Sequence, residues 1–180
     1  MPLTITVPGR EFYDQRTGSF INVPETTLRL EHSLYGIRLW ESKWKVPFLD
    51  EVNEKTKEQM RDYVRFMTLT KNVNPLVYFA LTNDNLKQIE EYINDPATAA
   101  TFKELPGQRH GTGKFVSAET IYFQMFQNNI PLECEKWNFN SLRALVEYCN
   151  RESAPKKKLS KDENIARMRA LKQRRRGKRR

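Results

Sequence analysis

The sequence predicts an α+β fold that is mainly helical, with a small β element at the N-terminus and a basic tail at the C-terminus. Leu3, Ile5 and Val7 alternate with threonines, which is the period-2 pattern of a strand. From Ser33 onward the apolar residues recur at helical spacing instead. Positive charge is concentrated after Pro155, at the far end of the chain.

The charge distribution divides the chain into residues 1–154 and 155–180. The second segment holds 13 of the 31 lysines and arginines but only 2 of the 22 acidic residues. It therefore carries about +11, while residues 1–154 carry about −2. We predict a nearly neutral globular domain over 1–154 and a flexible or helical basic tail over 155–180, so the net charge of +9 describes the tail and not the domain.

The β element is predicted from three short segments. Residues 3–7 form the first strand, which ends at Pro8 and Gly9. Residues 20–23 follow the turn signal at Thr17-Gly18 and are expected to be the returning strand of a hairpin. Residues 27–32 alternate again, which predicts a third strand.

Six helical segments are predicted in the domain, each beginning after a residue that can cap a helix. The expected caps are Ser33, Thr56, Asn74, Asn83, Ser117 and Asn138. The second helix is expected to span about 14 residues. In the fourth, Leu86, Ile89 and Ile93 are expected to face inward, and the fifth carries Ile121, Tyr122, Met125 and Phe126. In the tail, residues 161–175 have only a weak apolar stripe and are expected to gain helix on meeting an acidic or apolar partner.

No motif indicates catalysis, so we expect a protein that is not an enzyme. Neither His32 nor His110 has a Ser, Cys or Asp placed in a motif that would activate it. We expect His32 to be half-exposed at a strand position and His110 to be solvated in a loop over 103–114. The segment Gly107–Lys114 looks like a phosphate loop, but Phe115 stands where a Ser or Thr would hold magnesium.

The two cysteines indicate neither a disulfide framework nor a zinc site. Cys134 and Cys149 are fifteen residues apart with no paired histidine motif, so we expect reduced thiols, no metal and no cofactor. Cys149 lies on the apolar stripe of its helix and is expected to be buried. No apolar run reaches the length of a membrane span, and the first eight residues lack the features of a secretory signal, so the expectation is a cytoplasmic protein without a membrane partner.

The basic tail is the strongest candidate for partner binding, because a cluster of like charges repels itself and is usually an interaction segment. The candidate residues are Lys156, Lys157, Lys158, Arg167, Arg169, Lys172, Arg174, Arg175, Arg176, Lys178, Arg179 and Arg180. The tail has no aromatic residue on which bases could stack, so any contact with nucleic acid is expected to be weak and independent of sequence.

A second candidate surface combines two tryptophans with basic residues of the 103–114 loop. Trp40 and Trp44 lie at i and i+4, either as an aromatic contact surface or as part of the core with lysines beside them. The core interpretation is favoured, because large aromatic residues at helical spacing usually pack inward. Arg109 and Lys114 are the loop residues that would contribute to the contact surface.

Motifs along nearly the whole chain resemble a family of small proteins of tailed bacteriophages. They are Leu28–Leu34, Trp40–Trp44 with Pro47–Leu49, Met67–Pro75, Leu81–Asn83, Tyr92–Thr98, Thr120–Tyr122, Ile130–Cys134, Trp137–Asn140 and Pro155–Ser160. Members of this family tend to be encoded in the tail-gene block near the tape-measure gene and are often classed as tail assembly chaperones.

The resemblance implies a non-enzymatic chaperone that keeps the tape-measure protein soluble in the host cytoplasm during tail assembly. A folded domain with an adaptable basic segment suits this task, because it can contact many sites on a long helical chain weakly. Two alternatives remain open. One is a structural tail or connector component of the virion whose basic tail contacts DNA or another virion protein, and the other is a regulator that binds nucleic acid without sequence specificity. The sequence leaves the oligomeric state open.

Overall fold

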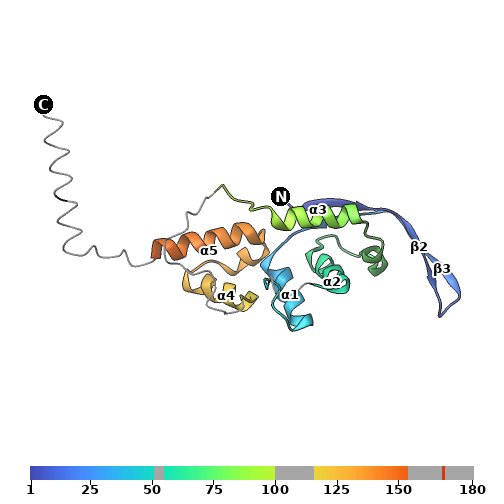
Figure 1. The fold of residues 1–180 in the computed structure, drawn as a ribbon, viewed down its shortest axis with the longest axis horizontal. Helices are drawn as coiled ribbons and strands as arrows, with labels where there is room; N and C mark the ends of the chain where they lie inside the picture. The colour runs from blue at the N-terminus through green and yellow to red at the C-terminus, as the bar shows by residue number, and fades with distance from the viewer. Residues whose placement is uncertain (51–54, 100–115, 154–167, 169–180) are drawn as a thin grey trace, which may run out of the picture. The chain divides into compact units, whose positions relative to one another are not determined.

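The structure is a computed structural model that describes residues 1–50, 55–99, 116–153 and 168. The chain divides into two compact units, Met1–Cys149 and Asn150–Arg180, and the first is described here. It is α+β and mostly helical, as the sequence predicts (Figure 1). The predicted loop at 103–114, the predicted boundary after residue 154 and the tail other than Met168 lie outside the described residues.

The β element is one long antiparallel ribbon that is interrupted in the middle. Strands β1 (Leu3–Val7) and β4 (Thr26–Leu30) pair in the half beside the helices. Strands β2 (Arg10–Asp14) and β3 (Ser19–Val23) pair in the other half, which extends beyond the helices in Figure 1. The strand β2 was not predicted, because both of its faces are largely solvated and its sequence lacks a regular apolar alternation.

The interruption lies where the chain is least able to continue the ladder of hydrogen bonds. Residues Pro8-Gly9 stand opposite Pro24-Glu25, between the pairs Val7–Thr26 and Arg10–Val23. A proline has no backbone N–H to donate, so Pro8, which faces Glu25, and Pro24, which faces Gly9, remove donors from both sides of the ribbon. The β1–β4 half contributes most of the ribbon's buried residues, and Val23 of β3 and Phe12 of β2 add contacts to the core from the other half.

Five α-helices and two 3-10 helices are described, and most of the predicted caps are correct. They are α1 (Leu34–Trp44), α2 (Lys57–Met67), η1 (Pro75–Phe79), α3 (Asn83–Asn94), α4 (Ala118–Gln127), η2 (Leu132–Lys136) and α5 (Phe139–Ser153). Helix α2 has 11 residues, fewer than expected, and η2 was not predicted. The cap of α3 is Thr82 and not Asn83, because Thr82 and Asn85 bond reciprocally as a capping box.

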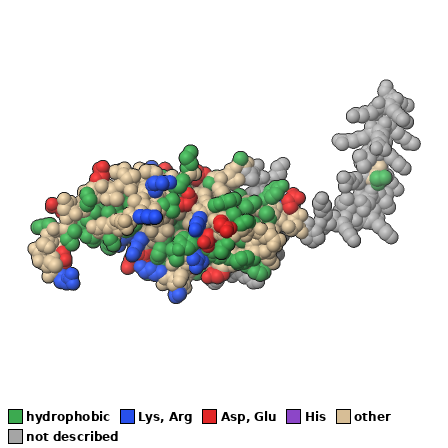
Figure 2. Space-filling model, turned by 180° about the vertical axis from the view of Figure 1, so that it is seen from behind, with side chains coloured by type: hydrophobic (Ala, Val, Ile, Leu, Met, Phe, Trp, Pro, Cys, Tyr) green, Lys and Arg blue, Asp and Glu red, His purple; other side chains and the backbone are tan. Residues whose placement is uncertain are grey.

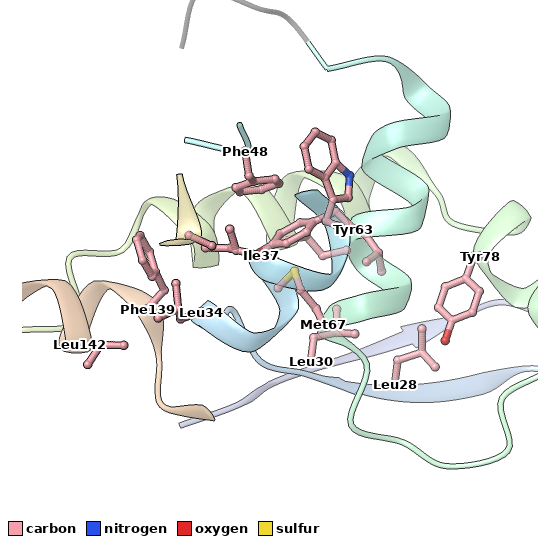
Figure 3. Packing of buried hydrophobic residues seen from close by; sticks show 14 of the residues in the cluster. Leu28, Leu30, Leu34, Ile37, Phe48, Tyr63, Met67, Tyr78, Phe139 and Leu142 are labelled. Carbon is pink, nitrogen blue, oxygen red and sulfur yellow. The ribbon is translucent and has the colours of Figure 1, made fainter. Parts of the chain in front are cut away.

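One face of the β1–β4 pair forms the floor of the hydrophobic core. Leu28 and Leu30 of β4 are fully buried, and Figure 3 shows Leu30 beneath Met67 of α2 and Leu28 beneath Tyr78 of η1. The free edge of β4 is covered by the segment that follows α2, because Leu69 N–H donates to the Arg29 carbonyl at 2.7 Å. The strand edge is thereby closed by the protein's own backbone.

Candidate partner-binding surfaces

Of the two tryptophans that could have formed a contact surface, Trp40 is buried in the core. Its side chain is 1% exposed, and its indole N–H donates to the Gln59 carbonyl on α2 at 2.8 Å. Trp44 is half-buried and donates to the Asp62 carboxylate at 3.1 Å. The favoured core interpretation is therefore correct for Trp40, while Arg109, Lys114 and the basic candidates of the tail lie outside the described residues.

His32 is also buried, which contradicts the expectation of a half-exposed strand position. The alternation ends at Leu30, and the chain then turns inward to begin α1, so His32 is only 2% exposed. Its Nδ1 atom hydrogen-bonds with the Tyr63 hydroxyl, and the Phe139 ring packs edge-on against it. Burial lowers the pKa of His32 to about 4, so the ring is neutral near pH 7.

A second polar cluster joins β4 to α3 and α5. The Tyr92 hydroxyl donates to the Glu31 carboxylate at 2.6 Å, and the Asn138 side-chain amide lies 3.4 Å from the same oxygen. Burial and the bond to Glu31 raise the pKa of Tyr92 to about 12. Among the described residues no buried side-chain nitrogen or oxygen lacks a hydrogen-bond partner, so these groups act within the fold as ties between elements.

Helix α4 presents two phenylalanines to solvent, and we call them the α4 aromatic pair. Phe123 is 61% exposed and Phe126 is 65% exposed, while Ile121 and Met125 face the core. Residues three apart lie on one side of a helix, so the two rings form a single apolar surface. Figure 2 shows hydrophobic side chains gathered over the part of the domain that holds α4 and α5.

Helix α4 is tied to its neighbours at its start and at its middle, which fixes where this pair lies. Ser117 makes no side-chain capping bond, and the buried Glu41 carboxylate of α1 instead accepts from the Ala118 N–H at 2.8 Å. In the middle of the helix the Tyr122 hydroxyl donates to Glu135 of η2 at 2.6 Å. The exposed rings therefore belong to a helix that is bound to its neighbours and not to a loose segment.

A groove of about 150 Å³ lies between α2 and η1, and we call it the α2–η1 groove. It is lined by Glu58, Arg61, Asp62, Arg65, Pro75, Tyr78 and Phe79. The Arg61 guanidinium stacks over the Phe79 ring, 4.0 Å from its centroid, and Phe79 is 51% exposed. The groove combines an apolar floor with a charged rim, and no sequence motif pointed to it.

Comparison with protein-family models, curated proteins and solved structures finds no match to this chain. Over 1–50, 55–99, 116–153 and 168, no cluster of three or more His, Cys, Asp and Glu residues is placed to hold a metal ion. In the same residues no helix combines the length and apolar character that crossing a membrane requires. The α4 aromatic pair and the α2–η1 groove are two candidate binding surfaces among the described residues.

Proposed function

We propose that this protein is a non-enzymatic chaperone of phage tail assembly, which binds the tape-measure protein and keeps it soluble until the tail tube encloses it. The observation that supports the proposal best is the α4 aromatic pair, because two exposed phenylalanines on a firmly held helix form a ready apolar contact. The sequence resemblance names the partner, and the basic tail supplies a second, electrostatic contact.

The chemistry of the partner agrees with this surface. A long helical protein that awaits enclosure exposes apolar faces to water and tends to aggregate. Burial of a phenylalanine side chain contributes about 1.5–3 kcal/mol, so two rings give a useful affinity that is still reversible. Reversibility is needed, because the chaperone must leave when the tube assembles.

Co-expression of the full chain with the tape-measure protein tests the proposal. The wild-type chain should raise the soluble fraction of the tape-measure protein and co-purify with it. Replacing Phe123 and Phe126 by Ser should reduce binding roughly tenfold or more. Leu86→Ser is the matched control, because Leu86 is an exposed apolar residue on another helix and is 40% exposed. If the wild-type chain does not bind the tape-measure protein, the proposed function is wrong.

The contribution of the tail is measured by charge neutralisation in the full chain. Replacing Arg174, Arg175 and Arg176 by Gln should weaken binding and flatten its salt dependence. Unchanged solubilisation by this variant would contradict a role for the tail. Mass spectrometry of purified particles separates the virion-component alternative, since a fixed copy number in the mature virion would argue against a chaperone.

A further inference from the structure

The α2–η1 groove has a positive rim, although residues 1–154 as a whole carry a net charge of about −2. Lys57, Arg61 and Arg65 recur every four residues, so they form one stripe along α2. Within the described part of the chain neither arginine lies within ion-pair distance of a carboxylate. One of the two carboxylates that line the groove, Asp62, is already bound by Lys43 and by the Trp44 indole N–H. The free charge at the rim is therefore mainly cationic.

The shape of the groove follows from how η1 begins. Asn74 caps η1 and Pro75 stands in its first turn, which fixes the start of this short helix against α2. Tyr78 is then buried, at 7% exposure, while Phe79 turns outward beneath Arg61. Stacking on the ring holds the Arg61 guanidinium in place, so its remaining N–H groups are oriented before a ligand arrives.

The volume favours a protein partner over a small ligand. Pockets for cofactors and metabolites measure roughly 300–1,000 Å³. The α2–η1 groove, at about 150 Å³, has room for one apolar side chain over its floor of Pro75, Tyr78 and Phe79. Arginines on the rim add bidentate recognition of carboxylates next to that side chain.

We propose that the α2–η1 groove binds an acidic amphipathic helix of the partner protein, taking one apolar side chain into the groove and its flanking carboxylates on Arg61 and Arg65. This is helix-in-groove recognition, with an apolar anchor and complementary charge. It deepens the proposed function, because it states which chemistry of the tape-measure protein the domain recognises. A duplex nucleic acid fits less well, since its phosphate backbone has no apolar group to place over the floor of Pro75, Tyr78 and Phe79.

Residue-resolved NMR on the full chain tests the groove without the tape-measure protein. The probe is a helical peptide of about 18 residues in which one leucine is flanked by glutamates one turn away on each side. The control peptide carries lysines in place of the glutamates. Because the basic tail also attracts an acidic peptide, the readout is the set of amide signals that shift. Saturable shifts in Arg61, Arg65, Tyr78 and Phe79 with the glutamate peptide alone are expected.

Two variants, each with a matched control, make the result specific. Arg65→Glu should weaken the affinity for the glutamate peptide, read from the shifts in the groove, roughly tenfold. Arg143→Glu, which reverses the charge of an exposed arginine on α5, should leave that affinity unchanged. Phe79→Ala should weaken the affinity as well, and its control Leu86→Ala should leave the affinity unchanged. Shifts confined to the tail, equal shifts with the lysine peptide, or equal shifts with a short DNA duplex would each overturn the proposal.

The tape-measure protein then separates this inference from the proposed function. If it binds the wild-type chain but binds Arg65→Glu and Phe79→Ala equally well, the chaperone function stands and the groove is not its contact. If it does not bind the wild-type chain, the function fails, and the peptide titration alone decides whether the groove recognises acidic helices.

Discussion

The carboxylate of Glu41 on α1 accepts a hydrogen bond from the Ala118 backbone N–H at 2.8 Å and caps α4 from another part of the chain. Its other oxygen accepts from the Phe48 N–H at 2.7 Å, in the segment that follows α1. One buried side chain therefore fixes both the end of α1 and the start of the helix that bears the aromatic pair. Burial raises the pKa of Glu41, although both N–H bonds act in the opposite direction.

Replacing Glu41 by Ala is expected to destabilise the fold by about 2–4 kcal/mol, because two backbone donors lose a charged acceptor. Glu41→Gln should cost less, since one oxygen remains. Glu90→Ala is the control, because Glu90 is exposed on α3, and it should change stability by less than about 0.5 kcal/mol. Urea denaturation of the three variants provides the measurement. Equal stability of Glu41→Ala and Glu90→Ala would show that the carboxylate does not hold α4.

Stability should fall in mild acid because of His32. Its pKa in the folded state is about 4, against 6.5 for an ordinary histidine, so the unfolded chain binds more protons between these values. The neutral ring therefore contributes stability that is present above pH 6.5 and is lost as the pH falls towards 4. A shift of this size corresponds to about 3 kcal/mol.

The pH dependence is measured by denaturation at a series of pH values for the wild type and for His32→Asn. Asn can still bond with the Tyr63 hydroxyl but does not titrate, so the variant should be less stable at pH 7 and lose less on acidification. Glu41 acts in the opposite direction, because its raised pKa means that stability falls as the pH rises through its titration. Parallel curves for wild type and His32→Asn would refute the role of His32.

The local elements were predictable from sequence because their causes are local. Ser33, Thr56 and Asn138 cap helices through bonds to residues two or three positions later, and sequence spacing carries that information. The fold class followed from the same periodicities. The strand β2 did not, because a solvated ribbon needs no apolar alternation.

The candidate surfaces depended on contacts that spacing does not carry. An apolar stripe shows which side of a helix can be buried, but not how much of it a neighbour covers. Leu86 and Phe126 are thus exposed although both lie on apolar stripes of their helices. Glu41 gave no signal, because its partners lie 7 and 77 residues away. The α2–η1 groove likewise needed η1 to be placed against α2.

The cap of α3 can be tested with two neighbouring asparagines. The Asn85 side chain accepts from the Thr82 N–H at 3.2 Å and donates to the Thr6 carbonyl of β1 at 3.1 Å, so it both caps α3 and ties it to the sheet. Asn85→Ala should cost about 1–3 kcal/mol. Asn83 is exposed in the first turn, and Asn83→Ala should be nearly neutral. If Asn83→Ala lost more stability than Asn85→Ala, Asn83 would be the cap of α3, as the sequence predicts.

The interrupted ribbon predicts different costs for alanine at its two glycines. A Cβ atom at Gly9 would lie 3.1 Å from the Glu25 nitrogen and 3.2 Å from the Val23 oxygen, and neither backbone atom can move aside without opening the ribbon. Gly9→Ala should therefore cost about 1–3 kcal/mol. At Gly18 a Cβ atom meets nothing within 4 Å, and the loss of about 1 kcal/mol comes only from its φ of +66°. Denaturation of both variants decides the point. If Gly9→Ala loses no more stability than Gly18→Ala, the two sides of the ribbon do not approach closely at the break.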